Sequence, residues 1–236
     1  MIIAAVSDIH APRNFEQFVR AVDSMKIKPD VFLIAGDMVD RGKLEEYDKI
    51  YNVLFGKINC PVVACFGNNE FESMRETAKM KYPDIKFLDD EATMMRIGEK
   101  TVGIVGTTGS LDSPTPWQRE NIKNIEGIFR ERVNFVDRQL QRIQADFKIV
   151  LMHYSPTYKT LEGENSRFYS SMGSRAYEMV LQNRKPTAVI HGHSLRGTRT
   201  AWLDTVPVFN VAFAVSRVIT VIDTENLKPG LTKFVE

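Results

Sequence analysis

Side chains that bind metal ions stand at the ends of several short apolar runs in this chain. All four histidines are among them, and each has a carboxylate, an asparagine or a glycine close by in the sequence. Imidazole and carboxylate ligands gathered without thiolates suit Zn, Mn or Fe. The pattern predicts a metal centre, and the residues that form the pattern are His10, Asp37, Asp40, Asn68, His153, His191 and His193.

The first third of the chain alternates buried strands with amphipathic helices, which predicts parallel strands joined by crossovers. In an open sheet of this kind, the functional site lies outside the carboxyl ends of the strands. Asp8, Asp37 and Asn68 each follow one strand and are therefore expected at this edge. The strands are expected at Ile2–Val6, Val31–Ala35 and Pro61–Phe66, and the helices at Phe15–Lys26 and Leu44–Leu54.

Later segments predict more strands, some of them antiparallel, and a long helical stretch after a polar loop in residues 107–146. The sequence contains no internal repeat and no obvious linker, so we expect a single domain over residues 1–236. A two-sheet α/β sandwich with helices on both outer faces accommodates this order. The further strands are expected at Ile85–Leu88, Met94–Ile97, Thr101–Gly106, Lys148–Met152, Ala188–Ile190, Val208–Val211 and Val218–Ile222.

The composition gives no bias toward a polyanionic partner, because the formal net charge is only +1. Nucleic acid is possible but not indicated, and no apolar run is long enough to cross a membrane. Cys60 and Cys65 are five residues apart in one strand-like run, too distant for an unstrained disulfide, so buried free thiols are expected. Free thiols and a first strand without a preceding leader predict a cytoplasmic protein.

Five short motifs occur in order along the chain. They are Asp8-Ile9-His10, Gly36-Asp37-Met38-Val39-Asp40-Arg41-Gly42, Gly67-Asn68-Asn69-Glu70, His153 and Gly192-His193. Together they closely resemble the motifs of the calcineurin-like metallophosphoesterases, and the second also matches the Gly-Asp-x-x-Asp-Arg-Gly form seen in the serine/threonine phosphatase branch. The resemblance covers most of the chain and implies a four-layer fold of two mixed β-sheets between helices.

The resemblance also implies two divalent metal ions (Mn, Fe, Zn or Ni) and a metal-activated water that attacks a phosphate ester. By analogy with the family, Asp37 belongs to both metals and has a catalytic role together with Asn68 and His153. One metal is expected to take Asp8, His10 and Asp37, and the other Asp37, Asn68, His153 and His193.

Two departures from the family pattern affect this expectation. Leu195 stands where the Gly-His-x-His motif normally ends in a metal-binding histidine, so the first metal is expected to bind weakly or to use water or His191. Asn69 stands where phosphatase members carry a histidine thought to protonate the leaving group. Asparagine is no general acid, so a substrate whose leaving oxygen departs easily is expected. Asn69 and Arg41 are predicted to contact the substrate, Arg41 by pairing with a phosphate oxygen.

Each signal also has a simpler explanation. Asp8 and Asp37 could cap the helices that follow them, and His153 could be a buried structural histidine. His191 could either hydrogen-bond near the metals or serve the fold alone. The basic stretch Trp117–Arg142 could be a solvated amphipathic helix, or part of a cap over the site that recognises an anion.

The sequence therefore favours a metal-dependent phosphoesterase that acts on a small phosphodiester or nucleotide-type ester. The alternative is a catalytically impaired protein of the same fold that acts as a binding module or scaffold. Leu195 and Asn69 keep this alternative open. Metal-stimulated turnover distinguishes the two functions.

Overall fold

The computed structural model describes residues 1–228 and contains two mixed sheets packed face to face. In the first sheet β1 is antiparallel to β11, whereas β1, β2, β3 and β4 are mutually parallel. Its strand order is β11 (Thr220–Asp223), β1 (Ile2–Val6), β2 (Val31–Ala35), β3 (Val62–Cys65) and β4 (Ile85–Leu88).

The second sheet is parallel in its centre and antiparallel at both edges. Its order is β5 (Glu91–Ile97), β6 (Lys100–Thr107), β7 (Phe147–Met152), β8 (Ala188–His191), β10 (Val206–Asn210) and β9 (Thr200–Leu203). The predicted α/β sandwich of two mixed sheets is therefore confirmed.

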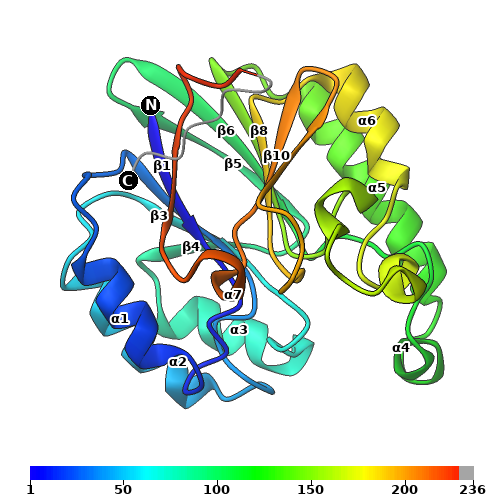
Figure 1. Cartoon of the computed structure of the whole chain (residues 1–236), viewed down its shortest axis with the longest axis horizontal. Helices are drawn as coiled ribbons and strands as arrows, with labels where there is room; N and C mark the ends of the chain where they lie inside the picture. Colours follow the sequence, from blue (N-terminus) through cyan, green and yellow to red (C-terminus); the bar gives the residue numbers. More distant parts are fainter. Residues whose placement is uncertain (229–236) are drawn as a thin grey trace.

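Helices cover both outer faces of the sandwich (Figure 1). Against the first sheet pack α1 (Phe15–Asp23), α2 (Leu44–Phe55) and α3 (Glu72–Lys81), and α7 (Phe213–Ser216) adds Phe213 to the same core. Against the second sheet pack α5 (Ile125–Arg142) and α6 (Ala176–Arg184). A separate core of apolar side chains fills the space between the sheets. The alternation of side chains along each strand explains how one strand serves two cores.

The long helical stretch predicted after residue 107 is divided in the structure. A short helix, α4 (Pro116–Asn121), begins with a capping box in which Thr115 and Gln118 bond each other's backbone N–H groups. Asn124 then adopts a left-handed conformation with φ 56°, and α5 begins after it. α5 buries Val136 and Leu140 against the second sheet.

Other elements differ from the prediction mainly at their ends. The first helix ends at Asp23, before the predicted Lys26, and the fifth strand begins at Glu91. α3, α6, α7 and β9 were not predicted, nor were two short 3-10 helices, η1 (Tyr158–Leu161) and η2 (Ser166–Ser171). Their apolar periodicity is weak because each contributes few core side chains.

The two cysteines are not paired with each other, as predicted. Cys65 is buried between the sheets, whereas Cys60 is only half-buried, which corrects the expectation that both thiols are buried. Within residues 1–228, no helix combines the length and apolar character needed to cross a membrane.

Candidate metal centre

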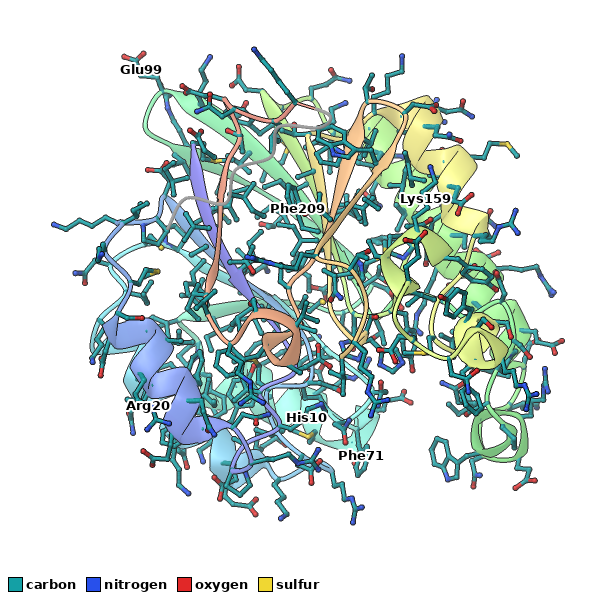
Figure 2. All side chains as sticks on the ribbon, in the orientation of Figure 1. His10, Arg20, Phe71, Glu99, Lys159 and Phe209 are labelled. Carbon is teal, nitrogen blue, oxygen red and sulfur yellow. The ribbon has the colours of Figure 1, made fainter. Side chains whose placement is uncertain are left out.

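The predicted ligands follow the strands at one end of the sandwich. Figure 2 shows His10 at the end opposite Glu99, which lies in the turn between β5 and β6. The loops after β1 and β2 run side by side, because the Asp8 amide donates to Gly36 O at 3.0 Å and the His10 amide to Asp37 O at 3.0 Å. These backbone bonds bring Asp8, His10 and Asp37 together.

Four of the predicted ligands have positive φ angles, which are uncommon for residues other than glycine. The angles are 58° at Asp8, 49° at His10, 54° at Asp37 and 67° at His193. Such conformations persist where the surrounding structure fixes them, and they concentrate at functional sites. The local backbone is therefore shaped to aim these side chains.

The first cluster consists of Asp8, His10 and Asp37, all of them buried. His10 Nε2 lies 3.6 Å from Asp8 Oδ1 and 3.9 Å from Asp37 Oδ2. One ligand atom from each residue lies within 4.8 Å of the other two, so a single cation could contact all three. Its protein donors all come from loops of the first sheet.

The second cluster consists of Asp37, Asn68, His153 and His193. One ligand atom each from Asp37, His153 and His193 fits within the same 4.8 Å limit. His153 Nε2 lies 3.5 Å from Asp37 Oδ2 and 3.0 Å from Asn68 Oδ1. Asp37 is the residue common to both clusters, and it joins ligands from the two sheets.

The hydrogen bonds of His153 indicate that a cation fits here. Its Nδ1 lies 2.9 Å from Ala35 O, an acceptor, so the neutral ring carries its proton on Nδ1. The bare Nε2 then faces two oxygen acceptors, on Asn68 and Asp37. Three lone pairs that converge in this way repel one another unless a proton on Nε2 or a metal cation lies between them. The donor set of imidazole, carboxylate and amide suits a divalent metal.

The three histidines of the two clusters differ in the direction of their pKa shifts. Burial would lower the pKa of His10 and His153, but the nearby carboxylates of Asp8 and Asp37 raise both pKa values above 6.5. Burial lowers the pKa of His193 to about 3, and the neighbouring His153 contributes to this shift. His193 is therefore neutral at physiological pH and ready to donate a lone pair.

The pKa values of the Asp8 and Asp37 carboxyls also shift in opposite directions. Burial would raise the pKa of Asp8, but contacts with His10, His153 and Ser7 lower it to about 2. Burial raises the pKa of Asp37, although His153 opposes the shift. A cation at the shared carboxylate would oppose this rise, because positive charge favours the ionised form.

Glu70 ends the motif Gly67-Asn68-Asn69-Glu70, whose pattern predicts no role for it, and the structure provides one. Its buried carboxylate accepts three backbone N–H bonds, from Asp37 at 2.9 Å, Met38 at 2.7 Å and Gly67 at 2.6 Å. These bonds join the loop after β2 to the loop after β3. A carboxylate placed directly after the motif Gly-Asn-Asn was the only signal for this role in the sequence.

Tyr154 is a second residue whose place was missed. Its ring lies edge-on to His193, with 4.9 Å between ring centroids, and 5.4 Å from the ring of His153. Gln118, on α4, donates a hydrogen bond of 3.2 Å to Tyr154 Oη. Tyr154 therefore connects α4 with two histidines of the second cluster.

The sequence of the chain matches a known protein family. A model of the calcineurin-like phosphoesterase family matches residues 1–197, which include every residue of both clusters. The chain belongs to this family. Phosphoester hydrolysis is the class of reaction that this membership supports.

The relatives within and around this family are distant in sequence. A probable glycerophosphodiester phosphodiesterase, GpdQ, from Arcobacter nitrofigilis is 21% identical over 86% of this chain and 74% of its own. Two solved structures share the fold. Phosphopantetheinyl hydrolase from Mycobacterium tuberculosis has a TM-score of 0.68 at 13% identity, covering 91% of this chain and 90% of its own. TT1561 from Thermus thermophilus has a TM-score of 0.64 at 18% identity, covering 96% of each chain.

The simpler explanations for the family's acidic motifs do not fit the structure. α1 begins after Asn14 and α2 after Lys43, and neither helix has a side-chain cap. Asp8 instead accepts hydrogen bonds from the Ser7 hydroxyl and the His193 amide. Asp8 and Asp37 therefore do not cap the helices that follow them.

His191 is not among the residues of either cluster. It follows Val189 by two positions on β8, so the two side chains are on the sheet face covered by α5 and α6. Its Nδ1 lies 2.8 Å from Gly192 O, and its buried Nε2 has no hydrogen-bond partner among the described residues. Burial lowers the pKa of His191 to about 4, so the ring is neutral. These contacts do not support His191 as a replacement ligand.

The remaining predicted residues surround the clusters. Asp40 Oδ1 lies 3.8 Å from His10 Nδ1, and Arg41 is exposed. Leu195, in the place of the family's histidine, is exposed two residues after His193. Asn69 lies against Asp37, with two contacts of 2.7 Å.

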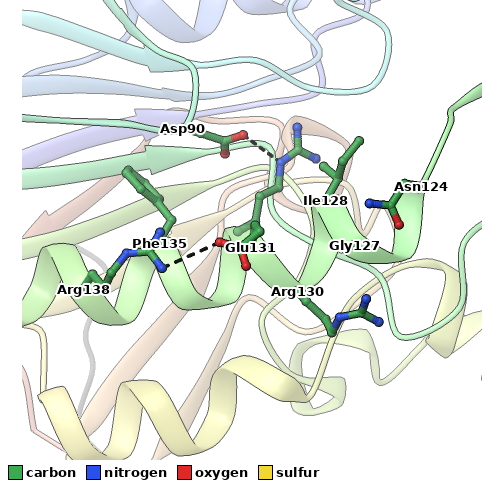
Figure 3. Close-up of a pocket in the computed structure, with 9 residues that line it drawn as sticks. Asp90, Asn124, Gly127, Ile128, Arg130, Glu131, Phe135 and Arg138 are labelled. Carbon is green, nitrogen blue, oxygen red and sulfur yellow. Dashed lines mark hydrogen bonds and ion pairs between the residues drawn. The ribbon is translucent and has the colours of Figure 1, made fainter.

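A pocket of about 490 Å³ lies along α5 and is separate from both clusters. Arg132 Nε lies 2.9 Å from Asp90 Oδ2, and Figure 3 shows Arg138 paired with Glu131. Arg132 also donates to Gly109 O, in the loop after β6. Because ion pairs already engage two of its three arginines, the pocket is only weakly basic.

Proposed function

We propose that this protein is a metal-dependent phosphoesterase that hydrolyses a small phosphodiester or nucleotide-type phosphate ester. The observation that carries the proposal is Asp37, which belongs to both groups of ligand atoms. A carboxylate shared between two cation sites is the arrangement used by two-metal phosphoester hydrolases. The name of the relative from Arcobacter nitrofigilis, a probable phosphodiesterase, supports a diester.

The bound ions would supply an activated water and would stabilise negative charge on the phosphoryl oxygens. Asp8, His10 and Asp37 would hold one ion, and Asp37, Asn68, His153 and His193 the other. Asn68 contributes a neutral oxygen, which limits the negative charge that an approaching phosphate meets. The Nδ1 bond to Ala35 O fixes the tautomer of His153 and aims its Nε2 at the site.

The substrate is expected to have a leaving oxygen that departs without a proton from residue 69. Arg41 is exposed beside the site, and its guanidinium matches the geometry of a phosphate. Contact of Asn69 with the substrate belongs to the same proposal. A cap formed by residues 107–146 also remains a prediction. The hydrogen bond from Gln118 to Tyr154 joins that segment to a residue that packs against His153 and His193.

The test is a panel of chromogenic phosphodiesters and monoesters assayed with Mn, Fe, Zn and Ni. We expect diester turnover that a chelator abolishes and added metal restores. His153→Ala should remove this turnover, because it deletes a ligand of the second cluster, whereas the exposed-loop variant Asp204→Asn should keep it. Turnover that survives complete metal removal would contradict the proposal.

The alternative is a binding module that has kept the fold and lost turnover. Leu195, which offers no donor atom, and Asn69, which cannot donate a proton as an acid, favour it. It predicts no metal-stimulated turnover with any substrate or metal in the same panel. The four donors of the second cluster favour the enzyme.

A further inference from the structure

Asn69 uses all four of its polar atoms within the candidate metal centre. Its backbone N–H donates to Asp37 Oδ1 and its Nδ2 to Asp37 Oδ2, both at 2.7 Å. Its Oδ1 accepts from the Arg41 amide at 3.2 Å, and its backbone O accepts from the Gly42 amide at 2.7 Å. Few of its hydrogen-bonding groups remain for a substrate.

The orientation of the Asn69 amide follows from its neighbours. The side-chain oxygen faces a backbone N–H, which can only donate, so the nitrogen must face Asp37. The flipped amide would set an oxygen against a carboxylate oxygen and a nitrogen against an N–H. Both contacts would be repulsive, so Nδ2 is the atom that donates to Asp37.

The Asp37 carboxylate is held tightly between these donors and the glycine before Asn68. A Cβ atom on Gly67 would lie only 2.2 Å from Asp37 Oδ1, so only glycine leaves room for the carboxylate there. Oδ2 points toward Nε2 of His10, at 3.9 Å, and of His153, at 3.5 Å. Each carboxylate oxygen has a second lone pair, so hydrogen bonds to Asn69 leave one on each oxygen for a cation.

We propose that Asn69 is a positioning residue that orients the shared carboxylate of Asp37 toward both clusters. This inference rests on the proposed function, because it assigns Asn69 a task within the same two-metal site. In this role Asn69 does not need to transfer a proton to the leaving group. Asn69 acts through Asp37, so its loss should weaken cation binding on both sides of that carboxylate.

The test compares Asn69→Ala and Asn69→Leu with the wild-type protein by calorimetric titration of metal-free protein with Mn²⁺. Both variants keep the backbone N–H and lose the Nδ2 donor, and leucine keeps the branch at Cγ without loss of side-chain volume. We expect the affinity of both ions to fall about tenfold or more in each variant, the scale of losing a partner that orients a ligand. At saturating metal, kcat should fall while KM stays unchanged.

Arg41→Ala is the matched control, because its side chain is proposed to contact the substrate and makes no contact with Asp37. It should raise KM and leave metal affinity unchanged. Metal affinity that is unchanged in Asn69→Ala and Asn69→Leu would overturn the inference, and a rise in KM alone would return Asn69 to substrate binding. A fall in Asn69→Ala alone would also overturn it, since lost volume would then be the cause. A wild-type protein that binds no metal would instead refute the proposed function.

Discussion

The two clusters of the candidate metal centre share one carboxylate but are built differently. The first takes its donors from the loops after β1 and β2, which neighbour each other in one sheet. The second also needs His153 and His193, which follow strands of the other sheet. The first cluster thus depends on local loop geometry, and the second on how the sheets pack.

The clusters also differ in how many protein donors they offer. The first has three, because Leu195 occupies the place of the family's further histidine, and the second has four with Asn68. The cluster that takes ligands from both sheets therefore has more protein donors. We therefore expect the second cluster to bind its ion more tightly than the first. Because both ions would share Asp37, binding at one cluster should affect binding at the other.

Asp37→Asn should have the largest effect, because it removes charge from both clusters at once. Two-metal sites stabilise the transition state by several kcal/mol, and each 1.36 kcal/mol is tenfold in rate, so we expect activity to fall by at least about 10³-fold. Elemental analysis beside a rate assay measures this, with Asp204→Asn as the control. Full metal content and full rate would show that Asp37 is not shared.

Glu70→Ala should destabilise the loops that carry the shared carboxylate. It leaves three buried N–H groups without their acceptor, at roughly 1 kcal/mol or more each, so the free energy of unfolding should fall by about 3 kcal/mol. Denaturant unfolding of the metal-free protein measures the loss, and Glu72→Ala, on the exposed first turn of α3, is the control. Equal stability of the two variants would contradict this role.

Leu195→His should reduce the difference between the clusters. An added imidazole would give the first cluster a fourth donor and tighten its ion by about 10–100-fold or more, since losing a group that only orients a metal ligand already costs that much affinity. The metal concentration for half-maximal rate should fall accordingly. Leu195→Ala, which adds no donor, should leave it unchanged. If the histidine has no effect, another group already completes the first cluster.

Metal affinity should rise with pH. His10 and His153 have pKa values raised above 6.5, so each retains a proton to higher pH than usual and must lose it before it binds a cation. Each cluster contains one of them, whereas His193, with a pKa of about 3, is already neutral. Affinity should therefore fall by up to about tenfold per pH unit in each cluster as pH drops through these pKa values. Calorimetry in buffers of different ionisation enthalpy would count the released protons, and affinity independent of pH would contradict the charge assignment.

The sequence predicted the strands that carry the clusters because buried strands form clear apolar runs. β1 and β2 match their predicted ranges, and Asp8 and Asp37 follow them as expected. The relative positions of the two sheets could not be read from the strand pattern. The pattern of ligand-type residues at strand ends grouped His153 and His193 with those of the first sheet's loops, and the resemblance to a family assigned both to one metal.

Residues that act through contacts distant in sequence were harder to find. Glu70 reaches backbone groups 32 and 33 residues away, and Gln118 reaches Tyr154, 36 residues away. No local period encodes such pairs. The break between α4 and α5 was missed because Asn124 adopts a left-handed conformation that composition alone does not reveal.

A calorimetric titration of the metal-free wild-type protein with Mn²⁺, paired with a diesterase assay at each point, tests the central claim most directly. Unequal clusters joined by Asp37 predict one tight ion, a second ion at least about tenfold weaker, and a rate that rises as the second ion binds. Two equally tight ions, or a full rate with one ion bound, would contradict it.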